Sequence, residues 1–284
     1  MPPLRIPPWI HAHRFAYTSL EDVPESELVR IRMELMRFRV KKPVVSIVIP
    51  AYNEAANILH TLSSLSHLRI ADIYPTEIIV VNDASTDETQ KILDTLGVKS
   101  IGLKENRRPK GARQVGLTMA KGTYLLQADA DTIYPEGWGI PYVEALRDPA
   151  VALVYGNHAF IPGKNNSRTA MFFHELLGET LYRLRKRNRE YINVHGFNSA
   201  FRREDGIHHG SYDHTPTGSE DGHMALLLSR IGRLEFIDTP ATLAWTSDRR
   251  IMADGGVWKG FSKRFKREGK RLIEYIFAGK RTDP

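Results

Sequence analysis

Long apolar runs rich in β-branched residues are the feature that most constrains how this chain can fold. The runs VVSIVIPA (44–51), TEIIVVN (76–82) and TYLLQ (123–127) are typical of strands buried on both faces, and a shorter run lies at 98–103. Segments with helical periodicity separate them, at about 55–68, 85–96 and 112–120. This alternation predicts an α/β fold with a parallel sheet wrapped by helices.

The rest of the chain is arranged around this alternating region. Residues 1–43 are predicted to form an N-terminal arm with a helix over 25–38, and 44–250 one domain with halves at 44–135 and 136–250. Within the second half, strands are expected at 150–160, 192–204 and inside 233–250, and helices at 167–190 and 219–232. Residues 251–284 have the pattern of a C-terminal amphipathic basic helix, with Trp258, Phe261 and Phe265 near one face.

Composition excludes several classes of function. The 284 residues include no cysteine, which excludes disulfides, thiolate metal sites and a cysteine nucleophile. A net charge of +7 favours an anionic partner such as a nucleotide, a phospholipid or a nucleic acid. No apolar run reaches the ~18–20 residues of a membrane span, and the N-terminus lacks the apolar core of a signal peptide. We therefore expect a cytoplasmic protein, with peripheral contact at the inner face of the membrane as the alternative.

Polar side chains follow each predicted strand of the first half. Because the carboxyl ends of parallel strands meet at one edge of a sheet, these side chains are expected to converge there. Asn and Asp also favour turns and helix caps, which explains any one of these positions without a function. Their convergence favours a ligand site. The residues are Asn53, Glu54, Asn82, Asp83, Asn106, Arg107, Asp129 and Asp131.

Asp129 and Asp131 are separated by the two-residue period of a strand, so both can project to the same side. Two carboxylates this close repel each other unless a cation lies between them or one stays protonated. A hard divalent cation, Mg²⁺ or Mn²⁺, would remove the repulsion and could hold a diphosphate.

A second acidic pair, Glu220 and Asp221, opens a predicted helix with Ser219 as its cap. Acidic residues in the first turn are stabilised by the helix dipole, which is an explanation without function. The functional interpretation makes one of them a general base that removes a proton from an attacking hydroxyl. His223, in the next turn, is either a metal ligand or a solvated helix residue.

Four segments of this sequence resemble family 2 glycosyltransferases of the GT-A fold. They are VSIVIPAYNEAANILHTLSSL, EIIVVNDASTDET, GARQVGLTMAKGTYLLQADADT and GSEDGHMALLL, and the similarity covers roughly residues 44–235. The resemblance implies a GT-A domain over 44–250, with a Rossmann-like mixed (mostly parallel) sheet flanked by helices. Its two halves would bind the nucleotide sugar and the acceptor. It also implies inverting transfer from a nucleotide-diphosphate sugar, such as a UDP- or GDP-sugar, to a hydroxyl acceptor, with Mg²⁺ or Mn²⁺.

The same resemblance assigns roles to individual residues. Asp221 is favoured over Glu220 as the catalytic base, and Asn198 and Arg202 are weaker candidates for acceptor binding. Metal binding is assigned to Asp131 and Asp129, with His223 as a further candidate. The residues expected to bind the nucleotide sugar are Pro50, Tyr52, Glu54, Asp83, Gly111, Arg113, Asp129 and Asp131.

The sequence also departs from many relatives that share the acidic motif. It lacks the Q-x-x-R-W motif of processive synthases, which favours a single-transfer enzyme. The segment AWTSDRR follows the acidic motif instead, and its Arg249 and Arg250 could either contact a diphosphate or remain solvated. The C-terminal basic helix would suit a lipid-linked acceptor at a membrane surface, or would simply pack on its own domain.

Three other functions fit parts of the sequence. A HAD-like phosphatase also has a DxD at a strand end, but that motif normally ends the first core strand, and here several α/β units precede it. A Rossmann oxidoreductase is excluded because PAYNEAAN contains no glycine. A basic protein that binds nucleic acid or a membrane surface would leave the acidic strand ends unexplained, so no nucleic acid is expected as a partner.

Overall fold

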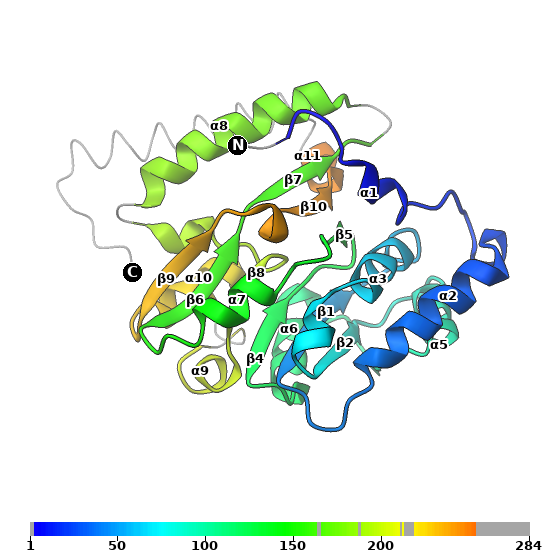
Figure 1. The fold of residues 1–284 in the computed structure, drawn as a ribbon, viewed down its shortest axis with the longest axis horizontal. Coiled ribbons are helices and arrows are strands. Elements are labelled where there is room, and N and C mark those ends of the chain that lie inside the picture. Colours follow the sequence, from blue (N-terminus) through cyan, green and yellow to red (C-terminus); the bar gives the residue numbers. More distant parts are fainter. Residues whose placement is uncertain (1–2, 164–165, 187–188, 211, 213–218, 254–284) are drawn as a thin grey trace.

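A seven-stranded sheet forms the centre of the protein. The computed structural model describes residues 3–163, 166–186, 189–210, 212 and 219–253. The strand order across the sheet is β3-β2-β1-β4-β8-β6-β9 (Figure 1). Its strands are β1 (Val45–Ala51), β2 (Thr76–Asn82), β3 (Ser100–Gly102), β4 (Tyr124–Gln127), β6 (Val151–Gly156), β8 (Ser199–Arg202) and β9 (Arg233–Ile237).

Strand directions confirm the predicted mixed, mostly parallel sheet. β1, β2, β3 and β4 are parallel to one another, and β9 is parallel to β6. Only β8 is reversed, because it runs antiparallel to both of its neighbours, β4 and β6. The four strands of the first half therefore end at one common edge, as the alternation of strands and helices in the sequence predicts.

Apolar residues of the central strands alternate between the two faces of the sheet, since successive side chains of a strand point to opposite sides. Ile47 and Ile49 of β1 lie in a core shared with α2 (Glu25–Leu35), α3 (Ile58–Ser66) and α5 (Thr89–Leu96). Val48, between them, lies in a second core with α6 (Arg108–Met119) and α10 (Glu220–Leu228). Both faces are thus covered, which is why these strands are apolar throughout.

The N-terminal arm lies against the domain and adds to its main core. Ile31, Leu35 and Phe38 from α2 and the turn η2 (Met36–Phe38) pack there and are at most 5% exposed. Further upstream, Ile10 of α1 (Pro8–His11) packs against the second sheet. Residues 3–43 therefore extend along the domain, with the turn η1 (Leu20–Asp22) between α1 and α2.

A second, three-stranded sheet has the order β5-β10-β7, with β5 (Thr132–Ile133), β10 (Ala244–Ser247) and β7 (His158–Ile161). The single strand predicted over 150–160 is therefore two strands, β6 and β7, which belong to different sheets. The chain changes sheets after Gly156, where a side chain would not fit, since a Cβ would lie 2.6 Å from the carbonyl oxygen of Thr242.

The expected helices of the second half are present, and several short elements were not foreseen. α8 (Arg168–Lys186) and α10 correspond to the predicted helices, and α6 begins earlier than predicted, with Pro109 in its first turn. The predicted helix over 251–284 lies outside the described residues, apart from the end of α11 (Arg249–Ala253). The short elements are α4 (Ile70–Ile73), α7 (Ile140–Ala145), η3 (Glu190–Asn193), α9 (Arg203–His208) and η4 (Pro240–Thr242).

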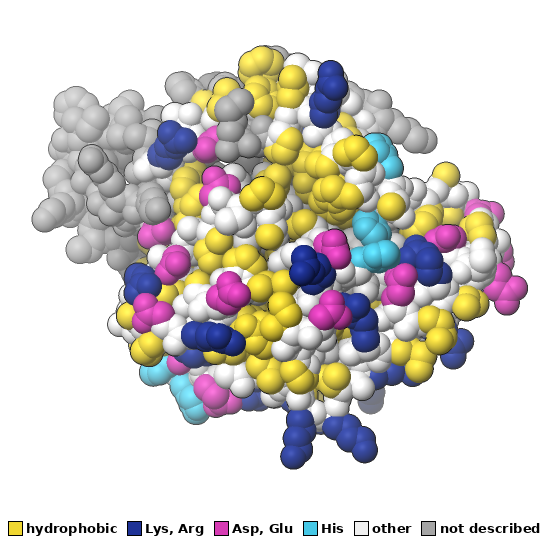
Figure 2. Space-filling view, in the orientation of Figure 1, with side chains coloured by type: hydrophobic (Ala, Val, Ile, Leu, Met, Phe, Trp, Pro, Cys, Tyr) yellow, Lys and Arg dark blue, Asp and Glu magenta, His cyan; other side chains and the backbone are white. Residues whose placement is uncertain are grey.

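Surface charge is mixed on the face of the molecule shown in Figure 2. Basic and acidic side chains alternate there with apolar ones, and neither sign forms a continuous field (Figure 2). On this face the net positive charge of the chain is therefore not gathered into a track of the kind that a nucleic acid needs. Within the described part of the chain, no helix has the length and apolar character required to cross a membrane.

Candidate active site

A cavity of about 420 Å³ opens at the edge of the sheet where β1, β2 and β4 end. This volume lies within the range of small-molecule sites, and the position is where parallel α/β sheets bind their ligands. The structure thus brings together side chains from three strand ends that lie up to 80 positions apart in the sequence. Six of the predicted nucleotide-sugar residues line it: Pro50, Tyr52, Glu54, Asp83, Asp129 and Asp131.

The backbone at this edge is strained. Among the described residues, Asn53, Ala84 and Arg108 have positive φ angles of 53°, 60° and 62° without being glycine. Asn53 and Ala84 lie in the loops that follow β1 and β2, and Arg108 is the first residue of α6, after the neighbouring strand β3. A left-handed backbone costs a non-glycine residue about 1–2 kcal/mol, and such strain concentrates at functional sites.

Hydrogen bonds between neighbouring loops hold these conformations. The amide of Asn53 donates to Ser85 Oγ (3.0 Å), and its side-chain oxygen accepts from the amide of Thr86 (2.8 Å). Asp83 Oδ1 accepts from the amide of Arg107 (2.7 Å), which ties the loop after β3 to the end of β2. The cavity wall is therefore preorganised, although it consists of loops.

Asp129, the first aspartate of the DxD sequence, lies toward the interior of the protein. Its Oδ1 accepts a hydrogen bond of 2.6 Å from Arg113 Nη2, and its backbone amide donates to Tyr134 Oη (3.0 Å). Only 3% of the Arg113 side chain is exposed. Arg113 was expected to contact the nucleotide, but the structure buries it behind Asp129, where its charge compensates that carboxylate.

Arg113 also connects Asp129 to the second acidic motif. Its Nε lies 3.5 Å from Asp221 Oδ1, so one buried guanidinium lies between the first DxD aspartate and the candidate base. Gly111, which was expected beside the nucleotide, lies two residues earlier on α6, and a side chain there would collide with Arg107. Its role in the structure is to allow this packing at the start of the helix.

Asp221 has the electrostatic environment of a proton acceptor near neutral pH. Burial raises its pKa to about 6, the Arg113 guanidinium opposes the rise, and the Glu220 and Asp129 carboxylates add to it. Within the described residues, Asp221 Oδ1 is buried and accepts no hydrogen bond. Gly196 makes room for this carboxylate, since a Cβ there would overlap it.

Asp131, the second DxD aspartate, lies toward the cavity and shares a cation with Glu54. Arg249 Nη2 lies 2.8 Å from Asp131 Oδ2 and 2.7 Å from Glu54 Oε1, and Ser247 Oγ donates to Asp131 Oδ2 at 2.6 Å. Burial raises the pKa of Glu54 despite the hydrogen bond from Arg249, and the charge of Asp131 adds to the rise. Two carboxylates that share one cationic nitrogen can share a metal ion in the same place.

The predicted three-residue metal site is not assembled. Across the residues that the structure describes, no three His, Asp or Glu side chains form a group that could hold a metal ion. Asp129 is engaged by Arg113, and His223 does not line the cavity, so the structure does not bring His223 to Asp129 and Asp131, and the role of these three residues in metal binding stays a prediction. The oxygens of Asp131 and Glu54 are nevertheless the hard donors that Mg²⁺ and Mn²⁺ prefer.

The two predicted acceptor residues lie elsewhere. Asn198 is 1% exposed, and its amide group bonds to Trp138, Tyr142 and two backbone carbonyls, which leaves it no room for a ligand. Arg202 lies at the opposite edge of the sheet, because β8 is antiparallel to β4 and Arg202 pairs with Tyr124 at the start of β4. Its guanidinium bonds to Asp205 and to the carbonyl of Leu146. Neither residue lines the cavity, and their role in acceptor binding stays a prediction.

Sequence reasoning left Arg249 undecided, yet it is a central residue of the cavity. It reaches Asp131 because β10 pairs with β5, which places Thr246 beside Thr132. The amide of Ser247 also donates to the carbonyl of Asp131 at 3.2 Å. The only sequence signal was the basic pair at the end of a predicted strand. The side chain of Arg250 lies outside the described part.

Comparison with known proteins supports the interpretation of this edge. Residues 46–207 match the sequence model of a family described as "Glycosyl transferase family 2". A chondroitin synthase of Pasteurella multocida is 30% identical over 146 residues, which make up 50% of this chain and 14% of that protein. A poly-beta-1,6-N-acetyl-D-glucosamine synthase of Staphylococcus epidermidis is 28% identical over 147 residues, 50% of this chain and 34% of that protein. The match thus covers about a third or less of these relatives.

Solved structures share the fold. The mannosyltransferase PcManGT from Pyrobaculum calidifontis, in complex with GDP-Man and Mn²⁺, superposes with a TM-score of 0.54 at 21% identity, over 85% of this chain and 72% of that one. Staphylococcus aureus TarS 1–349 in complex with UDP gives a TM-score of 0.54 at 20% identity, over 72% and 60%. At this level of identity the likeness establishes the GT-A type of fold.

Proposed function

Because the chain belongs to glycosyl transferase family 2, we propose that it transfers a sugar from a nucleotide-diphosphate sugar to a hydroxyl acceptor, with inversion at the anomeric carbon. The observation that carries this proposal is the division of charge at the carboxyl edge of the sheet. Asp131 and Glu54 share a cation inside the cavity, while Asp221 lies beyond Asp129 on the far side of Arg113. Asp131 and Glu54 suit the binding of a cation and a diphosphate, and Asp221 suits proton transfer.

The nucleotide part of the donor would lie against the ends of β1 and β2. Tyr52 is 47% exposed at the cavity and offers an aromatic face to a base. Asp83 has one oxygen bonded to the amide of Arg107, and the other can accept a hydrogen bond from a ribose or a base. Neighbouring folds have been solved with GDP-Man and with UDP, so we propose a UDP- or GDP-sugar.

The diphosphate would lie over Asp131 and Glu54 with Mg²⁺ or Mn²⁺. The donor carries negative charge toward two carboxylates, so binding needs cations between them. A bound divalent cation would supply charge that stabilises the diphosphate as it leaves. Arg249 would then exchange its bonds to Asp131 and Glu54 for bonds to a phosphate oxygen, because its half-exposed side chain is free to turn.

Asp221 would act as the base. Its carboxylate takes the proton of the acceptor hydroxyl while that oxygen bonds to the anomeric carbon. The bond from the anomeric carbon to the diphosphate oxygen breaks on the opposite face, and the electron pair leaves with the diphosphate. A single displacement of this kind inverts the anomeric configuration. The proton on Asp221 is afterwards released to water.

We propose single transfers rather than polymerisation. The curated relatives described above are named as synthases of polymers, but this sequence has AWTSDRR after its acidic motif and no Q-x-x-R-W. A lipid-linked acceptor would make use of the basic C-terminal segment, in a peripheral contact with a membrane.

Turnover of the donor tests this function. Wild-type protein would be incubated with UDP- and GDP-sugars and Mn²⁺, and release of the nucleoside diphosphate would be followed with water or added sugars as acceptors. Asp221→Asn should lower the rate by about 10²–10⁴-fold, the usual contribution of a general base. Glu220→Gln is the matched control, since it removes the adjacent carboxylate and should keep most of the rate. Equal rates in the two variants, or no release from any donor, would overturn the proposal.

A further inference from the structure

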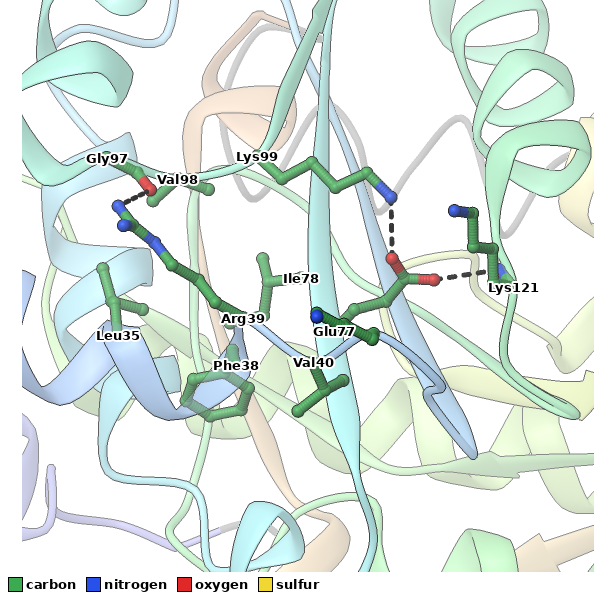
Figure 3. A pocket seen from close by; sticks show the side chains of 11 residues that line it. Leu35, Phe38, Arg39, Val40, Glu77, Ile78, Gly97, Val98, Lys99 and Lys121 are labelled. Atoms are coloured by element: carbon green, nitrogen blue, oxygen red, sulfur yellow. Dashed lines mark hydrogen bonds and ion pairs between the residues drawn. The ribbon is translucent and has the colours of Figure 1, made fainter.

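A second cavity, of about 410 Å³, opens at the opposite edge of the same sheet (Figure 3). Its walls come from the segment between η2 and β1, the start of β2, the turn between α5 and β3, and the chain just before β4. It shares no lining residue with the cavity at the carboxyl edge. Ile78 of β2 lies here and Asp83 follows the other end of that strand, five residues or about 17 Å further along.

The floor of this cavity is apolar. Leu35, Phe38 and Ile78 are between 4% and 5% exposed, and Val40 and Val98 complete the lining beside them. Leu35 and Phe38 belong to the N-terminal arm, so the cavity exists because the arm lies against the sheet. An apolar surface of this kind favours an aliphatic or aromatic group over a hydrated ion.

The rim is basic. Arg39, Lys41, Lys99 and Lys121 surround the opening, and Glu77 is the only acidic residue in the lining. Among the described residues, no acidic side chain pairs with Arg39, Lys41 or Lys121 at ion-pair distance. Because these cations attract negative charge, an opening with this rim is complementary to an anion.

Glu77 does not neutralise this rim, because its carboxylate is already fully engaged. Oε2 lies 2.7 Å from Lys99 Nζ, and Oε1 accepts from the amide of Lys121 at 2.9 Å (Figure 3). Oε1 also accepts from Ser46 Oγ at 2.8 Å. Burial alone would raise the pKa of Glu77, but Lys99 and these donors outweigh it and lower the pKa. Glu77 therefore remains ionised and holds Lys99, while three cations are left uncompensated.

One of these cations is held in place. Arg39 Nη2 donates to the carbonyl of Gly97 at 2.6 Å, at the residue that caps the C-terminus of α5. Gly97 has a φ of +64°, and a side chain there would collide with the Arg39 guanidinium. Arg39 thus forms a fixed wall of the opening, whereas the Lys41 and Lys121 ammonium groups are exposed to solvent.

We propose that this cavity binds a small anionic amphiphile, a molecule with one carboxylate, sulfonate or phosphate group and a short aliphatic or aromatic body. The body would lie on Leu35, Phe38 and Ile78, and the anionic group would lie between Lys41 and Lys121. The volume of about 410 Å³ lies within the range of small-molecule sites. This site is separate from the donor cavity and does not rest on the proposed transfer reaction.

Binding of 8-anilinonaphthalene-1-sulfonate, a fluorescent anionic amphiphile, tests the site on the full-length protein. The double variant Lys41→Gln/Lys121→Gln should weaken binding about tenfold, since it removes the two cations that would contact the anionic group. The matched control is Lys42→Gln/Lys104→Gln, which removes two exposed lysines that do not line the cavity. Val98→Trp, which fills the cavity, should abolish the same component of binding.

Competition identifies the chemistry that is recognised. Decanoate should displace the fluorophore from wild-type protein, while decanol and inorganic phosphate, each with only one half of the required chemistry, should not. The proposal is overturned if both double variants bind equally well, if Val98→Trp leaves binding unchanged, or if decanol competes as well as decanoate. Thermal melting of each variant confirms that it is folded, and nucleotide binding should be unaffected in all of them.

Discussion

The two edges of the central sheet carry cavities of nearly equal volume and opposite charge. At the carboxyl edge, about 420 Å³ is lined by Glu54, Asp83, Asp129 and Asp131, and at the amino edge, about 410 Å³ is surrounded by lysines and an arginine. The acids lie at strand ends and are mostly buried, whereas the lysines of the other rim extend into water.

This difference indicates which charges contribute to the free energy of folding. At the carboxyl edge, Arg113 is 3% exposed and bonds to Asp129, so its removal would leave buried carboxylates without a cation. At the amino edge, an exposed lysine is screened by water and contributes little to folding. The carboxyl edge therefore holds its charges in a fixed arrangement, whereas the lysines of the amino edge remain accessible to solvent.

The backbone follows the same division. The carboxyl edge holds three non-glycine residues with positive φ, whereas the turn beside the amino-edge cavity uses glycine, at Gly97, for its positive φ of 64°. Among the described residues, the positive φ angles of non-glycine residues thus lie at the carboxyl edge.

The largest effect that we predict is loss of stability in Arg113→Gln. Because Asp129 and Asp221 would lose their shared cation, the free energy of unfolding should fall by about 3–5 kcal/mol in urea titrations. Adding Asp221→Asn to this variant should recover part of the loss. Lys41→Gln, at the other edge, should change the same quantity by less than about 0.5 kcal/mol. Similar losses of stability in Arg113→Gln and Lys41→Gln would contradict this difference between the two edges.

The next effect is on the pH dependence of transfer. With a pKa of about 6 for Asp221, kcat/KM should fall about tenfold for each pH unit below that value, because the base becomes protonated. Glu220 raises this pKa, so Glu220→Gln should move the acidic limb of the profile to lower pH. An acidic limb that stays in place would show that Asp221 is not the titrating group.

The raised pKa of Asp221 also affects the stability of the folded protein. The pKa of Asp221 is higher in the folded protein than its ordinary value of 3.8, so its contribution to stability is present at low pH and is lost as the pH rises through about 6. Asp221→Asn should therefore gain stability relative to wild type between pH 4 and pH 7, measured by thermal melting across this range.

A smaller effect is expected on metal affinity. Arg249 occupies the position between Asp131 and Glu54 that a divalent cation would take, so Arg249→Gln should bind Mn²⁺ several-fold more tightly in the absence of nucleotide. Electron paramagnetic resonance of free Mn²⁺ measures this directly. Arg233→Gln is the matched control, since Arg233 also pairs with two acids and is 52% exposed against 49% for Arg249. Unchanged or weaker Mn²⁺ binding in Arg249→Gln would contradict the assignment.

The smallest predicted effect concerns the strained loop after β2. Ala84 has a φ of 60°, and glycine adopts this conformation without strain, so Ala84→Gly should raise stability by about 0.5–1 kcal/mol after the entropy of the unfolded chain is subtracted. Ala145→Gly, in helix α7, should lower stability by a similar amount. If both substitutions destabilise the protein, the positive φ of Ala84 does not carry the expected free-energy cost.

Much of the carboxyl edge could be predicted from the sequence, because it depends on patterns within short segments of the chain. A buried parallel strand reads as a continuous apolar run, and the polar residue after it must lie at the shared edge. Glu54, Asp83 and Asp131 were found in this way, and all three line the cavity. The order of strands and helices in the first half follows from the same pattern.

The features that the sequence pattern does not reveal depend on contacts between distant segments. The apolar pattern of 192–204 does not reveal that β8 is reversed, and reversal sends Arg202 to the far edge. In the same way, Arg249 reaches Asp131 only through the pairing of β10 with β5, across more than 110 residues. Burial of Arg113 was missed because an arginine at the start of a helix normally reads as exposed.

The central claim is that the carboxyl edge binds a nucleotide diphosphate together with a divalent cation. Calorimetric titration of UDP and GDP, with and without Mn²⁺, tests it most directly in wild-type protein, in Asp131→Asn and in the control Asp94→Asn, an exposed aspartate on α5. We predict that one nucleotide binds in a Mn²⁺-dependent way, that Asp131→Asn weakens its binding by about tenfold or more, and that Asp94→Asn leaves it unchanged. Absence of binding by either nucleotide, or equal affinities in the two variants, would contradict the account.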